Sequence, residues 1–303
     1  MLTIMQWAQH CPLTLEFDTA SEVSEELLYL KKKEGYVGKH SRQYRDFVFK
    51  EDDVLTLTYP KSGTHWMIEI LSLIRTKGDP KWIQSVPIWD RSPWIEILNM
   101  YEALEAQEGP RLITSHLPIQ LLPKSLFTSK AKVIHLIRNP KDVLVSGYFF
   151  SKVCSSFEQV ASLQEHFERF LQGNVLCGSW FEHTQGWMSM RGKESYLMLH
   201  YEELKRDTRS TIEKICQFLG KTLEPEEMNS VLKHSSIQAM RDNKMSNYTL
   251  MDGSNFNLKN GPFLRKGVSG DWKNHLTVAQ AEAFDRMFQE KMAGLPPELF
   301  PWD

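Results

Sequence analysis

The chain has 303 residues, and its 36 Lys and Arg against 38 Asp and Glu give a formal net charge of −2 at pH 7. This balance argues against a dedicated nucleic-acid binder, because such proteins depend on clustered positive charge. The composition is ordinary for a globular protein, and we find neither a membrane-spanning apolar run nor the apolar core of a signal peptide. We therefore expect a soluble cytoplasmic protein.

The four cysteines, Cys11, Cys154, Cys177 and Cys216, lie far apart in the sequence. No two of them have the short spacing of a zinc site, and a chain of this length folds without disulfides. We expect reduced thiols and no bound metal.

Residues 1–45 have the weakest patterning, and we expect a peripheral arm there, with one domain over residues 46–303. The first strong pattern, Asp53 to Tyr59, is aliphatic and β-branched and predicts a buried strand that ends at Pro60. Beyond a four-residue loop, apolar residues recur at helical spacing as far as Ile74, and Gly78 predicts the end of that helix.

The same order of strand, polar loop and helix recurs in the middle of the chain. Residues 131–137 are rich in Val and Ile and predict a second strand. Arg138 follows, then Asn139, which is suited to cap a helix, and Pro140, which is suited to the first helical position.

A third strand is predicted at residues 195–201, with helices around 209–219 and 226–234. Thr277 and Gln280 have the spacing of a capping box at the start of a final helix. Because strands alternate with helices and no linker or repeat divides the chain, we expect a single α/β domain with a central parallel sheet flanked by helices.

The loop Lys61-Ser62-Gly63-Thr64 places a lysine, two hydroxyls and a glycine between a predicted strand and a predicted helix. Backbone N–H groups at a helix N-terminus bind phosphate or sulfate readily. The loop lacks the GxxxxGK[ST] spacing of a nucleotide-triphosphate loop. Taken alone, it could equally be a simple connection with an exposed lysine.

Two further basic elements point in the same direction. Arg138 ends the second strand and Ser146 lies two turns into the next helix, a pair suited to a separate phosphate. Arg265 and Lys266 precede Gly267 in a polar segment that could also wrap an anion. Each element alone is weak, but together they predict a nucleotide that bears two anionic groups.

Three segments carry a resemblance to a known family. TYPKSGTHW (58–66), RNPKDVLVSGYFF (138–150) and RKGVSGDW (265–272) resemble, in order, the signature segments of the cytosolic sulfotransferases. WIQSVPIWDRSPW (82–94) and the C-terminal LPPELFPWD resemble the hydroxysteroid and bile-salt branch. The resemblance implies the P-loop-kinase-like sulfotransferase fold. The first 40 or so residues do not resemble the usual N-terminus of that branch, which is shorter.

The resemblance implies sulfuryl transfer from 3′-phosphoadenosine 5′-phosphosulfate to an acceptor hydroxyl, with adenosine 3′,5′-bisphosphate as product and no metal. Lys61, Ser62, Gly63 and Thr64 match the loop that holds the 5′-phosphosulfate. The other matching donor positions are Arg138, Ser146, Arg265, Lys266 and Gly267 for the 3′-phosphate, Trp66, Tyr201, Ser235 and Met240 around the adenine, and His65 next to the loop.

His116, in Thr114-Ser115-His116-Leu117-Pro118, matches the catalytic histidine. Histidine suits removal of the acceptor proton near pH 7, and Lys61 can stabilise the charge that develops on the leaving oxygen. His65 stands where the family usually has Asn or Thr. It is either a neutral replacement for the amide hydrogen bond or a second catalytic base.

On the acceptor side, the resemblance points to Trp89, Trp94, Phe150 and Tyr248. Aromatic walls with few charges suit a rigid apolar ring system such as a hydroxysteroid or a bile acid. The alternatives are a phenol or simple-alcohol sulfotransferase, a steroid-binding protein without turnover and a nucleotide kinase of similar architecture.

A last resemblance concerns assembly. Lys273, Thr277, Val278 and Glu282 form KxxxTVxxxE, which is similar to the short dimerisation motif of these enzymes. A homodimer is therefore expected, although the same residues would also suit a capped surface helix.

Overall fold

The computed structural model describes residues 46–302 except 156, 158, 252, 254 and 255. Four parallel strands form one sheet in the order β2-β1-β3-β4. They are β1 (Val54–Thr58), β2 (Leu112–Ser115), β3 (Lys132–Ile137) and β4 (Tyr196–His200). The predicted single α/β domain with a parallel sheet is confirmed. β2 has no counterpart among the predicted strands, because four residues are too few for an alternating pattern.

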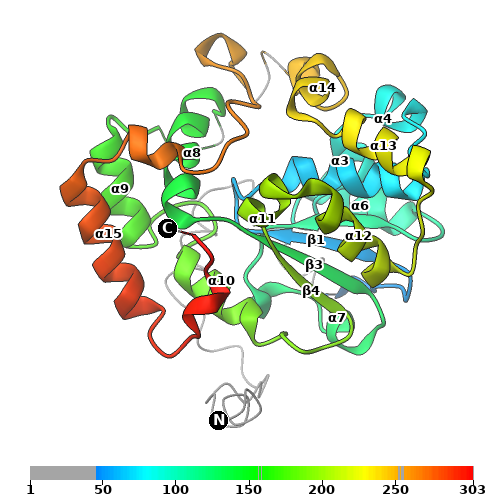
Figure 1. Ribbon diagram of the computed structural model, residues 1–303, viewed down its shortest axis with the longest axis horizontal. Helices are drawn as coiled ribbons and strands as arrows, with labels where there is room; N and C mark the ends of the chain where they lie inside the picture. Colours follow the sequence, from blue (N-terminus) through cyan, green and yellow to red (C-terminus); the bar gives the residue numbers. More distant parts are fainter. Residues whose placement is uncertain (1–45, 156, 158, 252, 254–255, 303) are drawn as a thin grey trace.

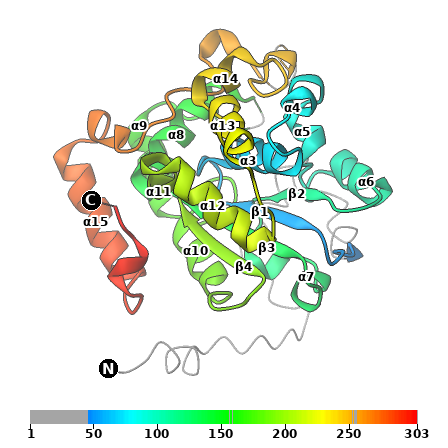
Figure 2. The same cartoon turned by 45° about the vertical axis from the view of Figure 1, so that its right-hand side comes forward.

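Helices connect the strands and cover both faces of the sheet (Figures 1 and 2). The α-helices are α3 (Thr64–Arg75), α4 (Lys81–Ser85), α5 (Ile88–Arg91), α6 (Leu98–Ala106), α7 (Ser125–Thr128), α8 (Pro140–Val153), α9 (Leu163–Leu171), α10 (Trp180–Met188), α11 (Tyr201–Arg206), α12 (Thr208–Leu219), α13 (Pro225–His234), α14 (Ile237–Asp242) and α15 (Val278–Lys291). Short 3₁₀ helices are η2 (Ile119–Leu121), η3 (Thr249–Met251), η4 (Leu258–Asn260), η5 (Asp271–Asn274) and η6 (Pro297–Leu299).

The predicted helix caps are present. The side chain of Asn139 accepts a hydrogen bond from the N–H of Lys141 at 2.9 Å, with Pro140 in the first turn of α8. Thr277 and Gln280 form the reciprocal capping box of α15. Each cap satisfies N–H groups that a helix start leaves unpaired, which contributes about 1 kcal/mol of stability.

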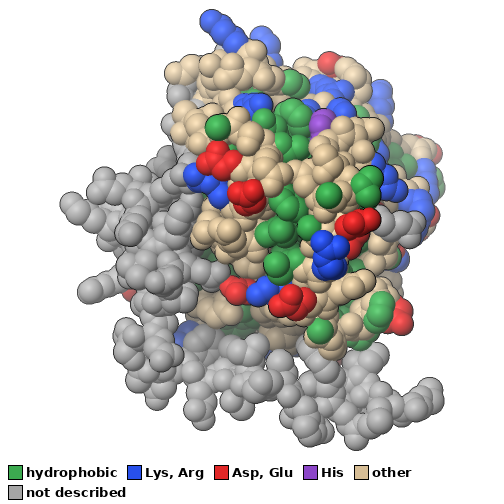
Figure 3. All heavy atoms as spheres, turned by 90° about the vertical axis from the view of Figure 1, so that its left-hand side faces the viewer, with side chains coloured by type: hydrophobic (Ala, Val, Ile, Leu, Met, Phe, Trp, Pro, Cys, Tyr) green, Lys and Arg blue, Asp and Glu red, His purple; other side chains and the backbone are tan. Residues whose placement is uncertain are grey.

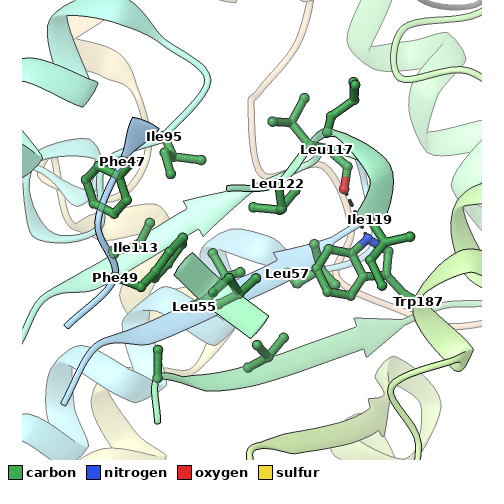
Figure 4. Packing of buried hydrophobic residues seen from close by; sticks show 14 of the residues in the cluster. Phe47, Phe49, Leu55, Leu57, Ile95, Ile113, Leu117, Ile119, Leu122 and Trp187 are labelled. Atoms are coloured by element: carbon green, nitrogen blue, oxygen red, sulfur yellow. Dashed lines mark hydrogen bonds between the residues drawn. The ribbon is translucent and has the colours of Figure 1, made fainter. Parts of the chain in front are cut away.

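The core has two layers because successive side chains of a strand point to opposite faces. Leu55 and Leu57 of β1 pack on one face against Trp187 of α10 (Figure 4). Ile134 and Leu136 of β3 pack on the other face, in the cluster that α3, α12 and α13 complete. Trp187 is fully buried, and its indole N–H donates to the carbonyl of Leu117 at 3.0 Å, so burial leaves no unpaired donor.

The strand order fixes where a ligand can bind. β1 lies between β2 and β3, so the connection from β1 leads to β2 on one side of it, and the connection from β2 leads back past β1 to β3 on its other side. The carboxyl ends of the strands lie at the same sheet edge, with Thr58 level with Leu136 and Leu57 level with Ser115. In open α/β sheets the crevice at such a switch point is the usual ligand site.

Three of the four cysteines, Cys154, Cys177 and Cys216, are buried, and Cys177 and Cys216 are free thiols. Cys11 and the predicted arm over residues 1–45 lie outside the described residues. In the described part of the chain, no helix is both long enough and apolar enough to cross a membrane.

Candidate active site

A cavity of about 860 Å³ opens at this edge of the sheet. It joins the loop after β1 to α8, α11 and the segment 260–268. The cavity brings together the following predicted residues: Lys61, Gly63, Thr64, His65, Trp66, Trp89, Trp94, His116, Arg138, Ser146, Phe150, Tyr201, Met240, Tyr248, Arg265, Lys266 and Gly267.

Two predicted donor residues do not line this cavity. Ser235 is buried, and its hydroxyl donates to the carbonyl of Val231 at 2.7 Å. Ser62 is also buried, and within the described residues its hydroxyl has no hydrogen-bond partner. Both side chains are buried beside the cavity, and their role in donor binding stays a prediction.

The turn between β1 and α3 requires a glycine. Gly63 precedes the first residue of α3 with a left-handed φ of 108°, and a Cβ there would lie 2.8 Å from the ring of Tyr201. No side chain caps α3, and its first turn contains no acidic residue. The positive end of the helix dipole thus faces the cavity without a competing carboxylate, an arrangement that favours an anion.

Lys61 adds a cation to this loop. Its ammonium nitrogen lies 3.6 Å from the ring centroid of Phe150 and 5.1 Å from that of Phe263. Burial, together with the positive charges of Arg138 and Arg265, lowers the pKa of Lys61 to about 7. A bound anion would stabilise the charged form and raise this pKa again.

Arg138 connects three parts of the site. Its guanidinium donates to the carbonyl of Lys61 at 3.0 Å and to that of Val268 at 2.9 Å, and it lies 4.4 Å from the ring centroid of Tyr201. Its Nε is buried and has no hydrogen-bond partner among the described residues. Arg138 therefore holds the β1 loop and the segment after Lys266 in place and still has a free donor.

The second pair of basic residues is held by one carboxylate. Arg265 and Lys266 lie 2.7 and 2.6 Å from the side-chain oxygens of Asp271, which is buried. The N–H groups of Gly270 and Trp272 in turn donate to Asp142 of α8. These contacts fix the 265–272 segment over the cavity beside Arg138.

His116 follows β2 directly. Its Nδ1 lies 2.9 Å from the carbonyl oxygen of Thr58, so Nδ1 carries the proton and donates, which leaves Nε2 as the basic nitrogen. Burial lowers the pKa of His116 to about 4. The ring is therefore neutral near pH 7 and can accept a proton from a ligand in the cavity.

The aromatic walls lie next to this histidine. The ring of Trp94 is 6.1 Å from that of His116, and Tyr248 stacks face to face on Phe263 with ring centroids 3.9 Å apart. Phe263 was not among the predicted residues, because only the fold brings it to Tyr248. Lys205 of α11, also not predicted, lines the cavity with its ammonium nitrogen 5.6 Å from the ring centroid of Trp66.

His65 lies between the basic loop and the aromatic wall. Its Nε2 is 3.0 Å from the hydroxyl of Tyr248, and its ring packs against those of Trp94 and Phe263. Burial, and secondarily the charge of Lys61, hold the pKa of His65 well below its usual value. The imidazole is thus a neutral hydrogen-bond partner of the tyrosine.

Comparison with known proteins identifies the family of this chain. Residues 51–296 match the sulfotransferase domain. The chain belongs to the sulfotransferase family. It is 63% identical to sulfotransferase 2A1 of Macaca fascicularis over 89% of this chain and 94% of that protein. It is 59% identical to 3-beta-hydroxysteroid sulfotransferase of Cavia porcellus, again over 89% and 94% of the two chains.

Two solved structures share the fold. Mouse sulfotransferase SULT7A1, solved in complex with PAP, is 31% identical over 86% of this chain and 92% of that chain, with a TM-score of 0.72. Retinol dehydratase, solved with androsterone and PAP, has a TM-score of 0.76 over 84% of this chain and 85% of that chain, at 20% identity. The second likeness extends to the fold alone.

The residues of the KxxxTVxxxE motif lie outside the cavity. Thr277 caps α15, Val278 is 75% exposed and Lys273 belongs to η5. α15 lies on the left of Figure 1, and Figure 3 turns that side toward the viewer. Apolar side chains are interspersed there with acidic and basic ones, so this face offers mixed contacts rather than one large apolar patch.

Proposed function

We propose that this sulfotransferase transfers the sulfuryl group of 3′-phosphoadenosine 5′-phosphosulfate to a hydroxyl of a hydroxysteroid or a bile acid, without a metal. The observation that carries the proposal is the position of a neutral His116 in one cavity with a cationic loop and aromatic walls. The names of the relatives, which include hydroxysteroid sulfotransferases, support the acceptor class.

The donor would occupy the basic end of the cavity. We assign the 5′-phosphosulfate to the loop of Lys61 and to the N-terminus of α3, where N–H groups and the helix dipole favour an anion. We assign the 3′-phosphate to Arg138, Ser146 and the segment from Arg265 to Gly267, and the adenine to Trp66, Tyr201 and Met240, with Ser235 behind them. The PAP in the SULT7A1 complex supports a donor of this type.

The reaction would be an in-line displacement. His116 accepts the acceptor proton at Nε2 while the acceptor oxygen forms its bond to sulfur. The bond from sulfur to the bridging oxygen breaks, and the pair of electrons stays on the phosphate of the product, adenosine 3′,5′-bisphosphate. Lys61 stabilises this charge as it develops, and the carbonyl of Thr58 holds the imidazole in the correct tautomer.

The acceptor would lie against Trp89, Trp94, Phe150 and Tyr248. These side chains line the cavity, and large aromatic faces bind a rigid apolar ring system through dispersion and burial. A phenol or a simple alcohol remains the second candidate, because the same walls could hold one flat ring.

The proposal is tested by following labelled sulfate from the donor to a bile acid, a 3-hydroxysteroid and a simple phenol, without added metal and with EDTA. We expect turnover with the steroid or bile acid, with a lower kcat/KM for the phenol. Preference for the phenol would favour the second candidate. Tight binding of adenosine 3′,5′-bisphosphate without turnover of any acceptor would favour a steroid-binding protein.

His65 gives a separate prediction about catalysis. We propose that it acts as the neutral partner of Tyr248 rather than as a second base, because its Nε2 is engaged by the tyrosine hydroxyl. His65→Asn is expected to keep kcat within about fivefold at every pH from 6 to 9, since a hydrogen bond contributes only about 1 kcal/mol. A changed pH profile of kcat in this variant would restore the second-base interpretation.

We further propose that residues 46–303 form the catalytic domain, with 1–45 as a peripheral arm, and that the protein acts in the cytoplasm. The buried free thiols of Cys177 and Cys216 support a reducing compartment. Cell fractionation of the full chain and activity of a chain that begins at residue 46 would test these statements.

We propose a homodimer formed through Lys273, Thr277, Val278 and Glu282. Val278→Glu places a charge on an exposed apolar side chain of this motif and is expected to shift the sedimentation coefficient to that of a monomer. Val48→Glu is the matched control, because Val48 is 68% exposed outside the motif. A dimer that persists in the Val278 variant would contradict this interface.

A further inference from the structure

A buried carboxylic acid lies behind the catalytic histidine. Glu96 is 7% exposed, and its Oε1 accepts a hydrogen bond from the backbone N–H of His116 at 2.8 Å. Its Oε2 is buried and has no hydrogen-bond partner in the described part of the chain. No ion pair of Glu96 is found among those residues either.

The position of Glu96 is set by a short pairing with β2. Trp94 forms a parallel bridge with Thr114, the N–H of Ile95 donates to the carbonyl of Thr114 at 3.1 Å, and the N–H of Thr114 donates to the carbonyl of Pro93 at 2.9 Å. The same stretch thus carries an aromatic wall residue, Trp94, and the side chain that holds the backbone of His116.

The hydrogen bond alone does not account for an acid at this position. An amide would accept the same N–H without the cost of burying an ionisable group that lacks a cationic partner. A carboxylate adds one property that an amide lacks, a negative charge next to the residue that must become an imidazolium.

We propose that Glu96 is a positioning residue whose carboxylate fixes the backbone of His116 and electrostatically stabilises the imidazolium formed during sulfuryl transfer. This inference rests on the proposed function of His116 as general base. Glu96 does not touch the acceptor or the donor in this scheme. The proton passes from the acceptor hydroxyl to Nε2 of His116 and then to solvent, and Glu96 keeps its charge throughout.

The scheme predicts which protonation state of Glu96 is active. Burial raises the pKa of Glu96 to about 7, against hydrogen bonds from the backbone N–H groups of His116 and Glu96 and from the side chain of Ser115, which lower it. Below this pH the carboxyl group is neutral and gives the imidazolium no support, and above it the charge is present. kcat should therefore rise with pH through about 7.

Other titratable groups near this pair must be separated from Glu96. Burial raises the pKa of Cys177 well above its usual value, and burial lowers the pKa of His183 to about 3 and holds that of His65 well below its usual value. None of these three groups changes charge between pH 5.5 and pH 8. Lys61 would titrate near 7 in the free protein, but bound adenosine 3′,5′-bisphosphate keeps it protonated.

The first experiment compares Glu96→Gln with the full-length wild-type protein. The amide retains an acceptor for the N–H of His116 but cannot ionise. We expect kcat at pH 8 to fall about tenfold, the rise of kcat through pH 7 to disappear and the Kd of adenosine 3′,5′-bisphosphate to stay unchanged. Glu96→Ala removes the hydrogen bond as well and is expected to lower kcat further.

The second experiment does not need turnover. The ¹³Cε1 NMR signal of His116 is followed from pH 5.5 to 8 in the complex with adenosine 3′,5′-bisphosphate, and the signal is identified by its loss in His116→Gln. We expect an inflection near pH 7 in the wild type that is absent in Glu96→Gln. Glu69→Gln is the matched control, because Glu69 is also buried but is paired with Arg91 at 2.8 Å; it should retain the inflection.

The outcomes separate the two proposals. If no acceptor is turned over, the proposed function fails. The NMR titration still shows whether the ionisation of Glu96 changes the electrostatic environment of His116. A wild-type signal without an inflection near pH 7 overturns the role of Glu96, even if Glu96→Gln does not fold. Unchanged kcat and an unchanged pH profile in Glu96→Gln, with only a lower Tm, would reduce Glu96 to a structural residue.

Discussion

His116→Ala is expected to lower kcat by about 10²- to 10⁴-fold, the usual contribution of a general base. The Kd of adenosine 3′,5′-bisphosphate should change little, because the hydrogen bond of Nδ1 is to the carbonyl of Thr58 and the basic donor residues remain in place. Steady-state rates and calorimetric binding of the product measure the two quantities separately.

His234→Ala is the matched control for this variant. His234 lies on α13 outside the cavity and bonds to Ser230, so the His234→Ala variant should retain wild-type kcat.

Because the pKa of His116 is about 4, its neutral form persists far into the acid range, and its own protonation should lower kcat only below about pH 5. A loss of product binding in His116→Ala as large as the loss of kcat would contradict the assigned role.

Arg138→Ala is expected to have the opposite effect. Loss of charged hydrogen bonds worth about 1.5–3 kcal/mol should raise the Kd of adenosine 3′,5′-bisphosphate by about 10- to 100-fold. kcat at saturating donor should fall much less. Some loss of Tm is also expected, because the guanidinium bonds to the carbonyls of Lys61 and Val268 in the folded protein.

Binding of adenosine 5′-monophosphate distinguishes a loss of 3′-phosphate contacts in Arg138→Ala from a loss of the structural hydrogen bonds to Lys61 and Val268. This nucleotide lacks the 3′-phosphate, so wild type and Arg138→Ala should bind it with similar affinity. Arg138→Lys retains the charge without the planar fork and should give an intermediate Kd for the bisphosphate. An equal loss of affinity for both nucleotides would assign Arg138 a structural role only.

Much of the fold is encoded locally, and for that reason it could be predicted. A strand such as Asp53 to Tyr59 is recognised by its aliphatic and β-branched residues, and the caps at Asn139 and Thr277 depend only on neighbours within one turn. The short strand β2 was not predicted. Its four residues are buried by the surrounding sheet, and this burial leaves no alternating pattern in the sequence.

The site residues also fall into a group that local sequence patterns predict and a group that they do not. The residue types in the loop at Lys61 and at Arg138 point to two anion sites before any contact is known, whereas His116 is identified as the base by its resemblance to the catalytic histidine of the family. Lys61 and Arg138 follow predicted strands whose carboxyl ends a parallel sheet must bring to one edge, so sequence order is enough to group these two. His116 follows β2, which was not predicted, and its place at the same edge comes from the structure.

The remaining contacts join residues far apart in the chain, and only the tertiary structure determines them. Tyr248 reaches His65 across 183 positions and stacks on Phe263, and Glu96 meets the backbone of His116 through a bridge beside β2. No local pattern reports such pairs, because they depend on how the helices and loops pack on the sheet. Local sequence patterns predict three of the four strands, the caps and the basic loop. Packing determines which aromatic and acidic groups surround the histidine. It also brings Nδ1 to the carbonyl of Thr58, which sets the tautomer, and buries the ring, which lowers its pKa.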